Sequence, residues 1–92
     1  MTAREEELIA RELLANQDLI DVCLKEHRWA EVAALLRYVR RDVPHELAST
    51  DPALYRTLRS QITRFYINGG AMFSLERLEA LAGEESVKRS SG

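Results

Sequence analysis

The sequence predicts an all-α fold, a small irregular bundle of four to five helices. Apolar residues recur every three or four positions in several segments, and helix-starting and helix-ending residues flank those segments. No stretch of useful length alternates apolar and polar residues as a half-buried strand would. The chain has 92 residues, 46% hydrophobic and 30% charged, which suits one folded core. We therefore predict a single helical domain over residues 1–83.

Two helices are predicted in the first part of the chain from one apolar stripe with a polar interruption. Thr2 and Glu5 have the spacing of a capping box, so the first helix should begin at about Thr2. The stripe continues to Leu24 and is interrupted by the polar residues 16–18, without a Gly or Pro to mark a break. We divide it near Asn16.

A third helix is predicted over about residues 29–42, after a short turn at His27 and Arg28. An apolar stripe with spacings of three or four positions consists of Trp29, Val32, Leu36, Val39 and Val43, and Pro44 cannot continue a helix. Residues 44–50 are predicted to be a polar linker.

The fourth helix should begin at Asp51 and Pro52, because Asp is a favourable N-cap and Pro suits the first helical position. Gly69 and Gly70 should end it, since glycine tolerates the left-handed conformation that closes many helices. The predicted apolar face consists of Leu54, Leu58, Ile62, Phe65 and Tyr66.

A last, short helix is predicted over residues 75–82, with Ser74 as its cap and Gly83 as its end. The polar residues 84–92 have no apolar pattern and are predicted to be a disordered tail.

Residues from Asn16 to Pro44 resemble one tetratricopeptide-type helical hairpin, with Val32, Leu36 and Val39 also at the offsets of that motif. The resemblance covers about a third of the chain and implies an antiparallel helix pair. No second copy follows to form a stacked array, so we take it to indicate a hairpin and not family membership.

Residues 74–83 resemble the first helix and turn of a helix-turn-helix of the phage-repressor type, which would imply DNA binding. Glu79 stands where that motif has a small buried residue, and the polar residues after Gly83 are too few for a recognition helix. We favour the alternative, a plain amphipathic helix that covers the core.

Candidate catalytic and metal-binding residues are few. Cys23 and His27 are four positions apart and could share a metal ion with Glu26 or His45, but zinc sites require three or four ligands. A Cys–His nucleophile would lack a third group to orient the imidazole. With no nucleotide-binding fingerprint either, we predict no catalytic residue, no cofactor, no metal and no enzyme activity.

Composition also limits the environment and the partners. The net charge of −2 argues against non-specific coating of nucleic acid, which requires excess Lys and Arg. The single Cys cannot form an internal disulfide, and neither a secretory signal nor an apolar run of about 20 residues is present. We expect a cytoplasmic protein that does not span a membrane.

Charge is segregated along the chain. Residues 1–36 carry four basic and eight acidic side chains, whereas residues 37–66 carry six Arg and three acids. The like-charge pairs Arg37 with Arg41 and Arg56 with Arg59 each cost an isolated helix about 0.2–0.5 kcal/mol. The helix dipole offsets this cost near the end of the third helix but not in the first half of the fourth. Arg56 and Arg59 therefore require acids from another helix or an external anion.

Two interpretations of this segregation remain open. Arg56 and Arg59 could pair with Glu12, Asp18 and Asp21 in an internal electrostatic zipper, or the Arg residues could form an interface. Arg outnumbers Lys eleven to two, and Arg with Tyr is a combination favoured in protein interfaces. The predicted partner-binding residues are Arg37, Tyr38, Arg41, Tyr55, Arg56 and Arg59.

The predicted function is that of a non-enzymatic protein-interaction module: an adaptor, inhibitor or regulator that docks this Arg/Tyr face on an acidic surface of a partner protein. The alternative is a nucleic-acid-binding regulator that uses the same Arg residues, either as a monomer or as a homodimer. A third interpretation is a subunit that folds stably only within a complex.

Overall fold

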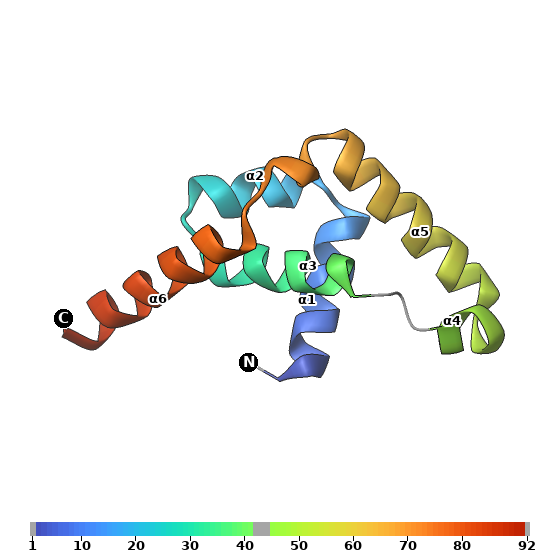
Figure 1. The fold of residues 1–92 in the computed structure, drawn as a ribbon, viewed down its shortest axis with the longest axis horizontal. Helices are drawn as coiled ribbons and strands as arrows, with labels where there is room; N and C mark the ends of the chain where they lie inside the picture. The colour runs from blue at the N-terminus through green and yellow to red at the C-terminus, as the bar shows by residue number, and fades with distance from the viewer. Residues whose placement is uncertain (1, 42–44, 92) are drawn as a thin grey trace.

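The computed structural model describes the backbone of residues 2–41 and 45–91, and side chains within these ranges except 45–46 and 85–91. This part of the chain is helical and contains no strand, so the predicted all-α class is confirmed. The helices, shown in Figure 1, are α1 (Ala3–Ala15), α2 (Asp18–Lys25), α3 (Trp29–Arg40), α4 (His45–Thr50), α5 (Pro52–Ile67), the short 3₁₀-helix η1 (Gly70–Met72) and α6 (Leu75–Ser91).

Helix α3 is the centre of the fold. Helices α1, α2 and α6 pack on it, while α5 packs on α1 and carries α4 and η1. The α4–α5 pair and the far end of α6 extend in opposite directions from this centre (Figure 1). The molecule is accordingly elongated, with extents of 47 × 26 × 19 Å.

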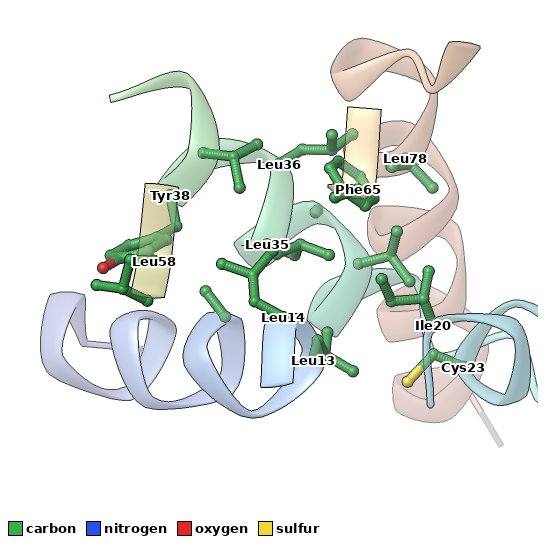
Figure 2. Close-up of a cluster of buried hydrophobic side chains, with 14 residues drawn as sticks. Leu13, Leu14, Ile20, Cys23, Leu35, Leu36, Tyr38, Leu58, Phe65 and Leu78 are labelled. Atoms are coloured by element: carbon green, nitrogen blue, oxygen red, sulfur yellow. The ribbon is translucent and has the colours of Figure 1, made fainter. Parts of the chain in front are cut away.

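The position of α3 follows from its sequence, because residues 32–36 are all apolar and all buried. A helix that is apolar on every side must be covered on every side. Tyr38 and Val39 of α3 are also buried, and the core side chains of the other helices converge on α3 (Figure 2): Ala10, Leu13, Leu14, Ile20, Cys23, Leu58, Phe65 and Leu78.

The predicted break between the first two helices is confirmed at Asn16, which has a non-helical conformation. Gln17, which belongs to this polar interruption, connects it to α5. The Gln17 side chain donates to the carbonyl of Gln61 at 2.9 Å and accepts from the Asn68 amide at 3.1 Å. These two hydrogen bonds attach the α1–α2 junction to the C-terminal half of α5.

The α2–α3 turn forms the predicted helical hairpin, in which the chain reverses direction (Figure 1). His27 adopts a left-handed conformation with φ 58°, which is uncommon for a residue other than glycine. The N–H of Arg28 donates to Cys23 O at 2.8 Å, and the N–H of His27 donates to Leu24 O at 3.3 Å. This pair of hydrogen bonds is the Schellman motif that closes a helix.

The predicted caps of three helices are confirmed. The side chains of Thr2, Asp51 and Ser74 each accept a hydrogen bond from a backbone N–H in the first turn of α1, α5 and α6. Gly69 follows α5 with φ 106°, as expected for a residue that ends a helix.

Residues 45–50, predicted to be linker, form the short helix α4, so that prediction is wrong for the part that the structure describes. Pro44 and the predicted end of the third helix at residue 42 lie outside the described residues. Leu47 is half-buried against the core cluster. Two adjacent apolar residues, Leu47 and Ala48, give no helical periodicity over six positions, so only this tertiary contact with α5 distinguishes a helix here from a linker.

Helix α6 does not end at Gly83 but continues to Ser91, and the backbone of residues 84–91, expected to be a disordered tail, is helical. Glycine inside a helix costs only about 1 kcal/mol relative to alanine, so one glycine does not oblige a helix to end. The resemblance to a helix-turn-helix is therefore wrong, because no turn follows residue 82. The division into a domain of residues 1–83 and a tail stays a prediction.

Candidate functional site

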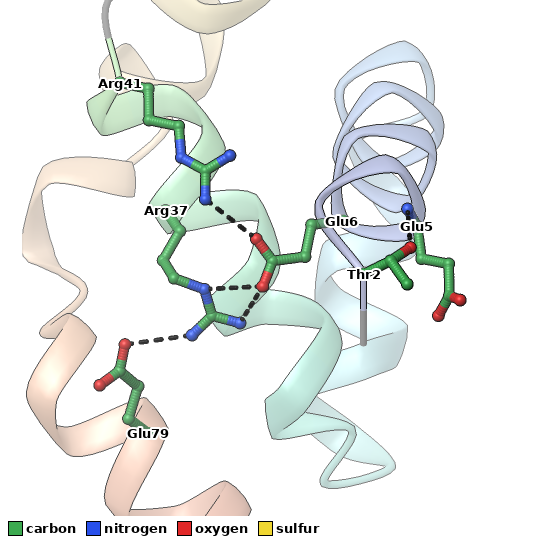
Figure 3. A network of polar contacts seen from close by, with 6 residues as sticks. All are labelled: Thr2, Glu5, Glu6, Arg37, Arg41 and Glu79. Carbon is green, nitrogen blue, oxygen red and sulfur yellow. Dashed lines mark hydrogen bonds and ion pairs between the residues drawn. The ribbon is translucent and has the colours of Figure 1, made fainter.

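Two of the predicted partner-binding residues, Arg37 and Arg41, form ion pairs within the fold (Figure 3). Arg37 contacts Glu6 Oε1 through Nε at 3.0 Å and through Nη2 at 2.9 Å. Its Nη1 contacts Glu79 at 3.1 Å, and Arg41 Nη2 contacts the other Glu6 oxygen at 3.2 Å. The network joins α3 to both α1 and α6.

The network neutralises the charge of Arg37 and Arg41 from inside the molecule. The Glu6 side chain is only 12% exposed. Burial lowers the pKa of Arg37, but its hydrogen bonds to Glu6 and Glu79 raise it by more, so the pKa is raised overall. Ion pairs with Glu6 and Glu79 thus compensate Arg37 and Arg41, in addition to the helix dipole that the sequence indicated for them.

Tyr38, a third predicted binding residue, belongs to the core. It is 8% exposed and lies beside Leu58 in the buried cluster (Figure 2). Its hydroxyl oxygen is buried and has no hydrogen-bond partner in the described structure. Tyr38 thus presents no surface on which a partner could dock.

The remaining predicted residues, Tyr55, Arg56 and Arg59, lie together on α5. Both Arg side chains are exposed, and neither forms an ion pair with a carboxylate of the described side chains. The Arg59 guanidinium carbon lies 5.7 Å from the centre of the half-buried Tyr55 ring, which is a cation–π geometry. The zipper with Asp18 or Asp21, proposed for these Arg residues, does not form.

The sequence of α5 makes this surface basic. It contains three Arg and no acidic residue. The third, Arg64, is also exposed, and it too lacks an ion pair with any carboxylate that the structure describes. No other described helix longer than one turn combines several basic residues with a complete lack of acids.

Tyr66 is a residue of this surface that the sequence reasoning placed on the apolar face. It is exposed, and its spacing of seven residues from Arg59 brings the two side chains to the same side of the helix. Tyr55, Arg59 and Tyr66 therefore follow one stripe beside the buried Leu58 and Phe65. Their spacing of four and then seven residues is the pattern from which the stripe could have been predicted. We call Tyr55, Arg56, Arg59 and Tyr66 the α5 Arg/Tyr face.

Comparison with known proteins adds no relative. No protein-family model, no curated protein and no solved structure matches this chain.

Cys23 and His27, considered above as a metal or nucleophile pair, point to different surroundings. The Cys23 thiol is buried and donates to Glu31 Oε2 at 3.5 Å, whereas the His27 ring stacks on Trp29 with 5.1 Å between ring centres. Burial first, and the negative charge of Glu31 second, raise the pKa of the thiol. The reactive thiolate is therefore disfavoured at neutral pH.

The described side chains contain no group of three or more His, Cys, Asp or Glu that could hold a metal ion. The side chain of His45, the other candidate ligand, lies outside them. None of the described helices is both long and apolar enough to cross a bilayer.

Proposed function

We propose that this chain is a non-enzymatic, cytoplasmic protein-interaction module that docks the α5 Arg/Tyr face on an acidic surface of a partner protein. The observation that carries the proposal is the pair Arg56 and Arg59, exposed and without a counter-charge among the described side chains, beside Tyr55. An adaptor, inhibitor or regulator would need such a surface and no catalytic residue.

The geometry supports protein binding for two physical reasons. The cation–π contact holds the Arg59 side chain near Tyr55, so less rotamer entropy is lost when a partner carboxylate binds. In addition, the like charges of Arg56 and Arg59 repel each other on the free helix, and a partner carboxylate between them would relieve that repulsion.

This proposal gives a structural role, in place of the predicted binding role, to Arg37, Tyr38 and Arg41. Their ion pairs and burial hold α3 against α1 and α6, so they support the fold on which α5 rests. We do not propose them as contact residues.

The decisive experiment changes the charge of the α5 Arg/Tyr face. A partner captured from the native host is purified, and its affinity is measured for the wild type and for Arg56→Glu combined with Arg59→Glu. We expect a loss of at least about tenfold in affinity with little change in thermal stability, because exposed charges contribute little to folding. The matched control is Arg4→Glu combined with Lys25→Glu, which makes the same change of net charge at two exposed sites elsewhere.

Nucleic acid is the alternative ligand, because α5 carries three Arg and no acid. A DNA duplex and a single-stranded RNA are titrated at low and moderate salt. Binding that falls steeply with salt and is lost in the double Glu variant would replace the protein-binding proposal with a nucleic-acid-binding function. Full partner affinity in the double Glu variant would refute the α5 Arg/Tyr face as the site.

A further inference from the structure

A second surface, separate from the α5 Arg/Tyr face, has the shape of a docking groove. It lies between the α2–α3 turn and the segment that joins η1 to α6, and its volume is about 370 Å³. We call it the Trp29 groove, after the one tryptophan in the chain. Its lining residues are Leu24, Trp29, Met72, Phe73, Ser74, Arg77, Leu78 and Leu81.

The wall formed by η1 is held in place by specific backbone geometry. Gly69 supplies the left-handed conformation with φ 106°, and a Cβ on Gly70 would overlap the ring of Phe65, so the turn packs closely on α5. Arg40 on α3 donates to the carbonyl of Phe73 at 3.3 Å. The turn is thus fixed at both ends, yet Met72 at its tip is 87% exposed.

The fold leaves the apolar side chain of Met72 in contact with water, which is energetically unfavourable. A large apolar side chain that stays in water does not contribute the burial free energy that a covered one contributes. Methionine is flexible and polarisable and is frequent on surfaces that adapt to apolar ligands. Trp29, half-buried beside it, belongs to the residue types that dominate the binding energy of interfaces.

The charge of the groove selects the kind of occupant. Arg77 is the only charged residue in the lining, and no carboxylate lines it. Arg77 is exposed and forms no ion pair with the carboxylates that the structure describes. An occupant that covers the apolar walls would also desolvate this guanidinium, so it needs a carboxylate to compensate it.

We propose that the Trp29 groove binds an acidic amphipathic helix of a partner protein. Apolar side chains three or four positions apart on that helix would cover Met72 and Trp29, and a Glu or Asp on its flank would pair with Arg77. Because the lining shares no residue with the α5 Arg/Tyr face, this inference stands independently of the function proposed above.

The experiment uses the full chain and Trp29 as a reporter. Since Trp29 is the one tryptophan, its fluorescence reports occupancy of the groove directly. The probe is a synthetic peptide of about 15 residues, long enough to form a helix on binding, with Leu at i, i+3, i+4 and i+7 and Glu at the positions that flank this apolar stripe. A second peptide has Lys in place of every Glu, and a third has the composition of the first in scrambled order.

Three variants test the named contacts. Met72→Glu should weaken binding of the acidic peptide at least about tenfold, because it places a charge in the apolar wall. Arg77→Glu should weaken the acidic peptide and strengthen the Lys peptide, which a merely structural role would not do. The matched control is Ile67→Glu, since Ile67 is 78% exposed and outside the groove, and it should bind like the wild type.

We expect saturable binding of the acidic peptide, weaker binding of the Lys peptide and none of the scrambled one. The combined Arg56→Glu and Arg59→Glu variant should bind the acidic peptide as the wild type does, so failure of either proposal can be recognised separately. The proposal is overturned by equal binding of the acidic and Lys peptides, by no binding up to about 1 mM, or by an unaffected Met72→Glu variant. A fluorescence change on raising the protein concentration alone, with a dimer in sedimentation, would show that a second copy occupies the groove.

Discussion

Arg37 on α3 donates to the Glu6 carboxylate on α1 at 3.0 Å, across 31 positions of sequence. The same carboxylate accepts from Arg41, so one acidic side chain neutralises two cations of α3. Glu6 therefore has a structural role that its neighbour Glu5 lacks, although both lie in the first turn of the same helix. Figure 3 shows the Glu5 side chain pointing away from the network.

Replacing Glu6 with Gln should lower the free energy of unfolding by about 1–3 kcal/mol, because the amide lacks the negative charge and has one acceptor oxygen in place of the two that accept from Arg37 and Arg41. Glu5→Gln is the matched control and should change it by less than about 0.5 kcal/mol. Urea melts of the two variants measure the difference. Equal effects would mean that the network contributes nothing to stability.

Leu58 and Ile62 on α5 should respond differently to truncation, because Leu58 is fully buried and Ile62 is half-buried. We expect Leu58→Ala to cost about 2–5 kcal/mol and Ile62→Ala clearly less. Chemical denaturation compares the two. A loss below about 1 kcal/mol at Leu58 would contradict the packing of α5 on the core.

Tyr38→Phe should leave stability unchanged or raise it by up to about 1 kcal/mol, since it removes a buried hydroxyl that has no hydrogen-bond partner in the described structure. Tyr38→Ala, in contrast, should destabilise the protein by leaving a cavity beside Leu58. Thermal melts distinguish these effects. Destabilisation by Tyr38→Phe would show that the hydroxyl has a partner in solution.

Cys23 should make stability depend on alkaline pH. The pKa of its thiol is raised above the usual 9.0, so the folded state holds this proton more tightly than the unfolded chain does. The resulting stability is fully present below pH 9.0 and is lost as the pH rises through the folded pKa. We expect the free energy of unfolding to fall less between neutral pH and pH 10 in Cys23→Ala than in the wild type. An equal fall in the free energy of unfolding in the variant and the wild type would contradict a raised thiol pKa.

His27→Gly should stabilise the protein by about 0.5–1 kcal/mol, because glycine adopts the left-handed conformation of the α2–α3 turn without the steric cost of a side chain. Glu26→Gly, just before it, has no positive φ to relieve and should be neutral or destabilising. Comparison of their melting temperatures tests the Schellman geometry. Loss of stability in His27→Gly would indicate that the stacking on Trp29 outweighs the backbone strain.

Features that depend on neighbouring residues could be predicted from the sequence. The caps at Thr2, Asp51 and Ser74 each involve a backbone N–H three residues later, and Gly69 ends α5 through its own φ. Such interactions extend over one helical turn, which a pattern of adjacent residues contains in full. The same range explains why Arg56 and Arg59, three residues apart, could be predicted to lie near each other on one helix.

The sequence by itself thus determined the all-α class, most helix starts and the basic character of α5, because periodicity, caps and composition are local properties. Only the tertiary structure decided which charges are exposed. Arg37 meets Glu79 across 42 positions and Arg41 meets Glu6 across 35, and no local pattern specifies such distant partners. Tyr38 became core and Met72 became surface for the same reason: the burial of a side chain depends on which helix packs against it.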